Sequence, residues 1–315
     1  MSFAGVDIRD AFFKEVYNIA MQDKNVVFIT ADTDSFVLHD FKRDLPRQFI
    51  NASVAEQNMI NVATGLALSG KKVFILALIP FVILRCFEHI KVNICSMNLP
   101  ITIIGLGAGF ASGIDGPTHH AIDDIAIMRV LPEITILNPS DSMLSANCAR
   151  IAYQANGPVY VRLDKGKFPE LYESSYDFSA GFKIIKPLRE VNIISTGFMT
   201  KEALRLIGKL KEKSLDAGLI DLYRIKPLNS LPLLKHIANS KLLVTIEENS
   251  IIGGIGTIVS ELLTDNRKSI ALKRIALKDK QYFNYGTREW LIDNCGMDIN
   301  SLVKDILTYL KITEN

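Results

Sequence analysis

The stretch Asn51-Ala-Ser-Val-Ala-Glu-Gln-Asn-Met-Ile-Asn-Val-Ala-Thr-Gly-Leu-Ala-Leu-Ser-Gly-Lys-Lys-Val-Phe-Ile-Leu-Ala77 joins a helical pattern to an apolar strand pattern. The spacing predicts a helix over residues 56–69 and a strand over residues 73–77. Because this helix is almost uncharged, the acid that opens it needs a reason. Ser53 and Glu56 have the spacing of a capping box, in which each side chain satisfies a free backbone amide. Glu56 is therefore either part of a helix cap or a catalytic group.

Apolar runs and helical segments alternate on both sides of this stretch. Further strand-like runs begin at Val26, Ile101, Thr135 and Val159. Such alternation is typical of an α/β fold with a largely parallel, doubly wound sheet. The pattern lapses after residue 165 and resumes at Val191 as a second, smaller α/β unit. We therefore predict two domains, residues 1–170 and 190–315, joined by a linker at 171–189.

The composition is that of an ordinary soluble protein of 315 residues. Its hydrophobic content of 48% allows a sizeable core, and its net charge of +2 gives no general attraction to nucleic acid or anionic membranes. The longest apolar run is interrupted by Pro80 and is too short to span a bilayer. The N-terminus has no secretory signal pattern, so we expect a cytoplasmic protein. The four cysteines show no metal-binding or disulfide spacing.

A second unusual string is Gly113-Ile-Asp-Gly-Pro-Thr-His-His120, which places an acid and two imidazoles in a turn. Imidazole can donate or accept a proton near neutral pH, which suits a catalytic site. The structural alternative is that Asp115 and Thr118 organise the turn and cap a helix, with His120 at the surface. Phe81, directly after Pro80, is either a stacking surface for a ring or a core residue.

Together, the string Val54-Ala-Glu-Gln-Asn-Met-Ile60 and the string Asp115-Gly-Pro-Thr-His119 resemble the transketolase family. The resemblance implies a thiamine diphosphate-binding (pyrimidine) domain followed by a transketolase C-terminal-like domain. It assigns Glu56 to the aminopyrimidine ring of the cofactor, where a carboxyl group can share a proton with a ring nitrogen. It assigns Phe81 to stacking on that ring. Leu78 stands where the family often has another aromatic residue.

The same resemblance implies the substrate contacts. Asp115 would recognise a sugar hydroxyl, and His119 would bind oxygen atoms near the reacting carbon, with His120 as a further candidate. Arg162, near the end of a strand, would hold the sugar phosphate, for which a guanidinium is well suited because it can bind bidentately. In the C-terminal part, Asn249 replaces a histidine that is common in the family, so no role of that histidine is transferred.

Complete transketolases also carry a Gly-Asp-Gly motif in a domain that binds the cofactor diphosphate through a divalent metal. That motif is absent from this sequence. We therefore expect a split transketolase: this chain is the C-terminal subunit, self-associated into a dimer core within a heterotetramer. A separately encoded N-terminal subunit would hold the Mg (or Ca) ion, and the substrate would be a sugar or sugar phosphate. The alternatives are a 1-deoxyxylulose-phosphate synthase-like carboligase subunit and a noncatalytic interaction subunit.

Overall fold

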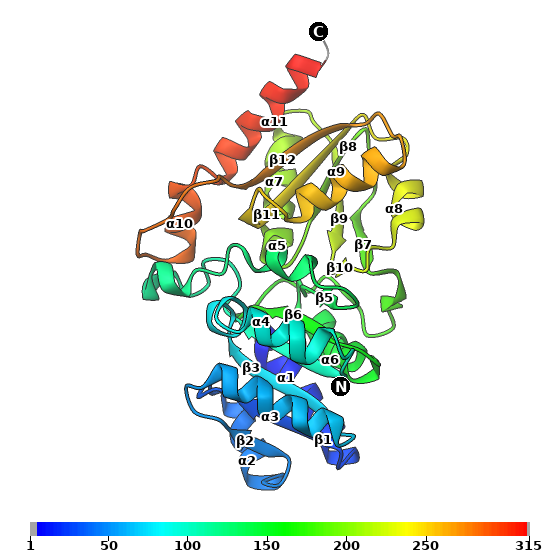
Figure 1. Ribbon diagram of the computed structural model, residues 1–315. Coiled ribbons are helices and arrows are strands. Elements are labelled where there is room, and N and C mark those ends of the chain that lie inside the picture. Colours follow the sequence, from blue (N-terminus) through cyan, green and yellow to red (C-terminus); the bar gives the residue numbers. More distant parts are fainter. Residues whose placement is uncertain (1–4, 314–315) are drawn as a thin grey trace. The chain divides into compact units, whose positions relative to one another are not determined.

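The computed structural model describes residues 5–313, which form two compact α/β units (Figure 1). The first unit contains residues up to 108 together with 127–176, and the second contains 109–126 and the rest of the chain from 177. The predicted fold class, two domains with largely parallel sheets, is confirmed. The segment 109–126 is grouped with the second unit, although it precedes two strands of the first in sequence.

The strands of the first unit lie in the order β5-β6-β4-β3-β1-β2, and every neighbouring pair is parallel. Their bounds are β1 (Val26–Thr30), β2 (Phe49–Asn51), β3 (Lys72–Leu78), β4 (Ile101–Leu106), β5 (Thr135–Leu137) and β6 (Val159–Leu163). Strands β1, β4 and β6 are buried along their whole length. Continuous apolar runs are expected of parallel strands that helices cover on both faces.

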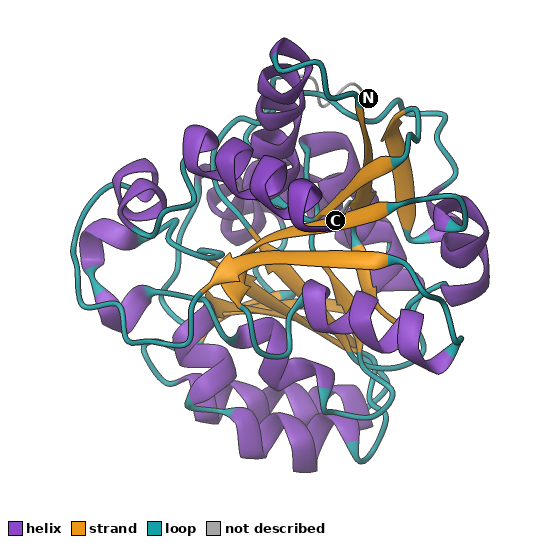
Figure 2. Cartoon of the chain, turned by 90° about the horizontal axis from the view of Figure 1, so that it is seen from above, coloured by secondary structure: helices purple, strands orange, loops and turns teal. Residues whose placement is uncertain are grey.

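The helices of the first unit are α1 (Ile8–Gln22), α2 (Phe36–Asp44), α3 (Glu56–Leu68), α4 (Phe87–His89), α5 (Asp124–Arg129, which begins in segment 109–126) and α6 (Ser142–Gln154). Two π-helical segments, η1 (Pro80–Leu84) and η2 (Ile90–Cys95), flank α4. Helix α1 packs against α2 and α6, whereas α3 packs against β3 and the segment 80–95. Helices lie on both sides of the strands in Figure 2.

The connections at β1 explain where a ligand is expected. The chain leaves β1 toward one edge through α2 and β2, then returns across β1 through α3 to β3. Because such crossovers are right-handed, α2 and α3 cover opposite faces of the sheet. Ligands of doubly wound sheets bind beyond the carboxyl ends of the strands at such a reversal. Glu56 follows β2 and Phe81 follows β3, so both lie on segments that leave this end of the sheet.

An aromatic cluster fixes α1 and α2 on the sheet. Phe28 of β1 lies edge-on to Phe13 at 5.8 Å and tilted against Phe41 at 5.3 Å, and Phe49 stacks on it at 6.2 Å. Each such pair contributes about 0.5–1.5 kcal/mol beyond its buried area. The sequence reasoning did not identify α2 or β2, which are short and mostly partly exposed, and this cluster shows what holds them in place.

The second unit has a five-stranded sheet in the order β12-β11-β8-β9-β7. Its strands are β7 (Phe182–Lys186), β8 (Val191–Ser195), β9 (Ala217–Leu222), β11 (Leu242–Ser250) and β12 (Ala271–Leu277), with a short β10 (Arg224–Lys226). Its helices are α7 (Phe198–Glu212), α8 (Ser230–Ile237), α9 (Ile255–Asp265), α10 (Arg288–Asn294) and α11 (Ile299–Thr313). Strand β7, antiparallel to β9, lies inside the range 171–189 that the sequence indicates as a linker. Over residues 5–313, none of the helices has both the length and the apolar character needed to cross a membrane.

Candidate active site

Glu56 is the first residue of α3, and its side chain is 3% exposed. The capping-box alternative is wrong: the N-cap is Ala55, which offers no side-chain bond, and Ser53 lies outside the helix with φ +56°. Ser53 instead has its own amide bonded to Asn51 Oδ1 at 2.9 Å. The Glu56 carboxylate is therefore not used to close the helix end, although its negative charge there is favourable to the helix dipole.

Arg85 is the partner of that carboxylate. Its Nη1 donates to Glu56 Oε2 at 3.1 Å, and its guanidinium carbon lies 5.0 Å from the centroid of the Phe81 ring. The Arg85 side chain is 48% exposed, so the pair joins a buried acid to a cation at the surface. A guanidinium over an aromatic face gains cation–π attraction, and Arg85 thus bridges the two residues assigned to one ring-binding site.

The segment that carries Phe81 and Arg85 differs from the continuous helix expected over residues 81–97. It consists of η1, the short α4 and η2, so most of its turns are wider than α-helical turns. Single π-turns inside helices often accompany functional sites. Cys86, next to Arg85, is buried and its Sγ lies 3.5 Å from the Phe81 carbonyl oxygen. Burial, followed by the nearby Glu56, raises the pKa of Cys86 to about 11, so this thiol stays protonated and weakly reactive.

Arg162 lies within β6, one residue before its end, and is 3% exposed. Its backbone is in register with Gly105 of β4, in the interior of the sheet. A guanidinium is rarely buried unless it is paired, so its place near the carboxyl end of a central strand is costly and specific. This placement agrees with the sequence prediction of a strand-end arginine.

Asp115, His119 and His120 lie in the second unit, on two short 3₁₀ turns, η3 (Gly113–Asp115) and η4 (Pro117–His119). Asp115 is exposed and His119 is half-buried, with His119 Nδ1 3.0 Å from Thr118 Oγ1. Gly116 between the turns has φ +83°, and a Cβ there would lie 2.1 Å from the Tyr285 ring. The turn therefore requires glycine at this position for both conformation and space.

His120 differs from the surface residue that the structural alternative predicted. It is 6% exposed and lies edge-on to Phe110 with ring centroids 4.8 Å apart. Within the described part of the chain, neither ring nitrogen has a hydrogen-bond partner that meets normal geometry. Burial lowers the pKa of His120 below its ordinary value, so the ring is neutral at physiological pH.

Glu248 at the end of β11 anchors the segment that carries these residues. Its carboxylate accepts a bond from Phe110 N at 2.9 Å and bonds from Arg288, whose Nε lies 3.1 Å from both oxygens. The Arg288 guanidinium in turn lies 3.6 Å from the centroid of the Phe198 ring. Gly109 has φ +61°, and a Cβ there would come within 2.2 Å of Glu248. This pair is closed on every side and holds the start of segment 109–126.

The neighbouring Glu247 has a separate, structural task. Its two carboxylate oxygens accept bonds from Ile255 N at 2.7 Å and Gly256 N at 2.8 Å, at the beginning of α9. These are the backbone donors that a phosphate would need at a glycine-rich helix start. The Gly-Gly-x-Gly sequence before α9 is therefore already satisfied by an internal carboxylate.

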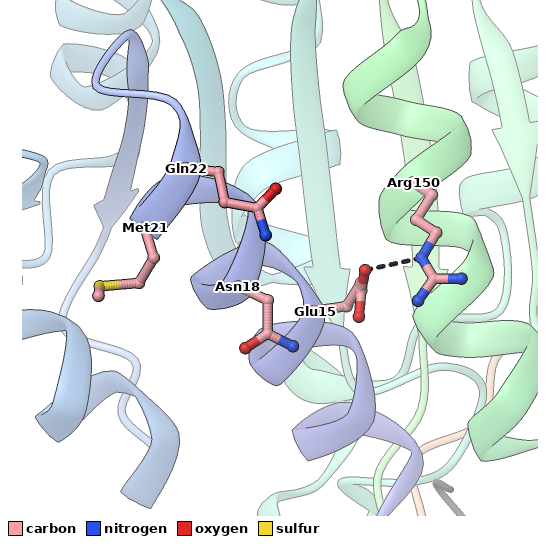
Figure 3. A pocket seen from close by; sticks show the side chains of 5 residues that line it. All are labelled: Glu15, Asn18, Met21, Gln22 and Arg150. Carbon is pink, nitrogen blue, oxygen red and sulfur yellow. Dashed lines mark hydrogen bonds and ion pairs between the residues drawn. The ribbon is translucent and has the colours of Figure 1, made fainter. Parts of the chain in front are cut away.

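Sequence reasoning missed Arg85, Glu248 and Arg288. The available signals were the cation four residues after Phe81 and the pair of acids ending a strand, yet both partners of each pair are at least 29 residues apart. Another pair of the same kind joins Glu15 of α1 to Arg150 of α6, beside a pocket lined also by Asn18, Met21 and Gln22 (Figure 3). No residue assigned to the candidate site lines that pocket.

Comparison with known proteins assigns both units. Residues 4–170 match the family described as transketolase, pyrimidine binding domain, and residues 181–301 match transketolase, C-terminal domain. One of the two subunits of an apulose-4-phosphate transketolase from Phocaeicola vulgatus is 31% identical, over 96% of this chain and 97% of that protein. A 1-deoxy-D-xylulose-5-phosphate synthase from Clostridium tetani is 28% identical over 96% of this chain, which spans 49% of that enzyme. A solved structure described as split gene transketolase, inactive beta4 tetramer, has a TM-score of 0.86 at 29% identity, covering 98% of this chain and 100% of that one.

Proposed function

The chain belongs to the transketolase family, and we propose that it is the C-terminal subunit of a split, thiamine diphosphate-dependent transketolase. With a separately encoded N-terminal subunit, it transfers a two-carbon ketol unit from a ketose or ketose phosphate to an aldose acceptor. The observation that carries this proposal is the buried Glu56 carboxylate beside the Phe81 ring. The likeness to a single transketolase subunit over nearly the whole length of both chains supports it.

The residues present fit the pyrimidine half of thiamine diphosphate. A buried carboxylate that the helix does not need as a cap can hold a proton at a ring nitrogen, and the aromatic ring nearby offers a stacking face. When bound, thiamine diphosphate supplies the carbon nucleophile and the electron sink of the reaction. Glu56 holds and returns the proton, while burial around it keeps water from competing for that bond.

The chain's other contribution is to bind and orient the sugar. In the proposal, His119 donates to or accepts from the oxygen atoms near the reacting carbon, and Asp115 binds a hydroxyl. Arg162 binds a phosphate remote from the reacting bond, where binding energy serves to position the substrate. His120, neutral and without a partner among the described residues, is a further candidate for a sugar hydroxyl.

The proposed assembly is a heterotetramer in which two copies of this chain form a dimer core. The N-terminal subunits hold the diphosphate and its Mg (or Ca) ion, so the chain is inactive without them. The structural relative described as an inactive tetramer of beta chains supports the dependence on a partner. Carbohydrate metabolism in the cytoplasm is part of the same proposal.

A second candidate reaction is the joining of a pyruvate-derived unit to an aldehyde phosphate. The match to a 1-deoxy-D-xylulose-5-phosphate synthase along 96% of this chain favours it. The two reactions use the same cofactor but different donors. They can therefore be separated by substrate without any change to the protein.

The test is to combine this chain, the candidate N-terminal subunit, thiamine diphosphate and Mg²⁺ with a panel of ketose phosphates and unphosphorylated ketoses. Pyruvate with an aldehyde phosphate forms a parallel arm, and each subunit alone is the control. Transfer from ketoses only in the mixture supports the proposal. Activity with pyruvate alone as donor selects the second reaction, and no activity in any arm favours a noncatalytic interaction subunit.

A further inference from the structure

The guanidinium of Arg85 makes both of the contacts that the proposed function gives to the pyrimidine ring. One Nη1–H donates to Glu56 Oε2 at 3.1 Å, and the same group lies over Phe81, with its carbon 5.0 Å from the ring centroid. A guanidinium is planar, carries N–H donors at its edge and stacks on aromatic faces. A protonated or imino pyrimidine presents the same combination of a flat face and an N–H edge.

We propose that Arg85 occupies the pyrimidine subsite of the isolated chain and is displaced when the ring binds. This inference rests on the proposed function, because that function assigns Glu56 and Phe81 to the ring. Arg85 is then an internal competitor of the cofactor. It keeps the buried Glu56 charge paired before the cofactor and the partner subunit arrive.

The exposure of the two side chains supports a movable contact. Glu56 is 3% exposed and fixed at the first position of α3, whereas Arg85 is 48% exposed and follows the end of η1. A half-exposed guanidinium recovers hydration when it turns outward, so breaking this pair costs little on the arginine side. The buried carboxylate cannot do the same, so it needs a replacement donor.

Competition of this kind has a measurable cost to binding. The apparent dissociation constant of the ring equals its intrinsic value divided by the fraction of molecules whose subsite is open. If the Arg85 contacts are worth what exposed ion pairs and cation–π contacts usually are, removing them should tighten binding about 3- to 10-fold. A positioning role for Arg85 predicts the opposite sign, because loss of the arginine would then disorder Glu56 and weaken binding.

The Arg150–Glu15 pair provides a matched control within the same unit. Arg150 is 51% exposed and donates from Nε to the 9% exposed Glu15 at 2.7 Å. The pocket beside it is lined by Glu15, Asn18, Met21, Gln22 and Arg150, none of which is aromatic (Figure 3). Arg150→Met therefore removes an equivalent ion pair but not the proposed competitor.

The experiment measures binding of 4-amino-5-hydroxymethyl-2-methylpyrimidine, the pyrimidine half alone, to the isolated full chain by saturation-transfer NMR and titration. The proteins are the wild type, Arg85→Met, Arg85→Gln and Arg150→Met, each checked by circular dichroism. We expect Arg85→Met to bind about 3- to 10-fold more tightly than wild type, Arg85→Gln to lie between them and Arg150→Met to match wild type. If Arg85→Met does not fold, Arg85→Gln decides the question, since its amide can still donate to Glu56.

Binding by Arg85→Met that is weaker than or equal to wild type, including no detectable binding by either, overturns the inference. Equal gains in Arg85→Met and Arg150→Met also overturn it, because the effect would then come from general loosening. These results are independent of the ketol-transfer assay. An active mixture of subunits without a gain in Arg85→Met removes only the inference, and a gain without activity on any sugar removes only the proposed function.

Discussion

The Glu56–Arg85 and Glu15–Arg150 pairs are alike in composition and exposure but differ in their surroundings. Each joins a buried glutamate to an arginine that is about half exposed, 48% for Arg85 and 51% for Arg150. Glu15 and Arg150 connect two long helices along their sides, whereas Glu56 begins a helix at the carboxyl end of the sheet and its arginine lies over an aromatic ring. The comparison teaches that the bond itself does not mark a site; the position on the sheet and the adjacent ring do.

The largest expected effect comes from changing the two glutamates in parallel. Glu56→Gln should lower ketol transfer by the reconstituted enzyme about 10²- to 10⁴-fold, because the amide cannot exchange the proton that the proposed chemistry needs. Glu15→Gln should leave the rate within about twofold of wild type, as expected for a residue remote from the site. Steady-state rates with matched circular dichroism spectra make the test. Comparable losses in both variants would show that the comparison has no functional content.

A third pair sharpens the comparison because it is closed on both sides. Glu248 and Arg288 are 2% and 9% exposed, and Glu248 also binds the amide of Phe110. Arg288→Met leaves a buried carboxylate unpaired and should lower the free energy of unfolding by about 3–5 kcal/mol. Urea denaturation measures it. A loss below about 1 kcal/mol would place this pair with the exposed ones.

The helix-to-helix pair should contribute little to stability. Arg150→Met is expected to lower the free energy of unfolding by about 1 kcal/mol or less, because the half-exposed arginine is well solvated in either state. The same denaturation assay applies, with the neighbouring Asn18→Ala as a surface control. A loss as large as that of Arg288→Met would mean that exposure is a poor guide to these pairs.

The smallest effect concerns pH and the segment 109–126. Burial lowers the pKa of His120, so the unfolded chain binds a proton at this residue more readily than the folded chain. His120 therefore favours the folded state above the ordinary histidine pKa, and this advantage is lost as the pH falls from about 7 toward 5. His120→Gln should reduce the fall in thermal midpoint over that range by an amount equivalent to about 1 kcal/mol or less. Identical pH profiles for both proteins would contradict the assignment.

Sequence patterns predicted the central elements well and the site contacts poorly, for physical reasons. The helix expected over 56–69 is observed over 56–68, because its apolar periodicity and its burial on β3 agree. The helix expected over 81–97 is instead broken into π turns, which leave no mark on apolar spacing. Arg85 was not selected because its partner lies 29 residues away.

The two histidines show the same division. Their place in a glycine-dependent turn follows from the residues Gly116 and Pro117, which the sequence displays. Which ring is buried depends on Phe110, whose amide is held by Glu248, 138 residues away. Burial of His120 rather than His119 is thus a tertiary effect that local spacing cannot express.

The most direct test of the central claim, that this chain supplies one half of a shared active site with Glu56 as its proton-handling group, is a competition titration. Wild-type chain is titrated into a fixed amount of the N-terminal subunit with thiamine diphosphate and Mg²⁺, and Glu56→Gln chain is then added in increasing amounts. We predict that ketol transfer rises to a plateau at equal subunit amounts and then falls as the Glu56→Gln chain replaces wild type. Activity of this chain alone, or an assembled mixture containing only the Glu56→Gln chain that works at the wild-type rate, would contradict the claim.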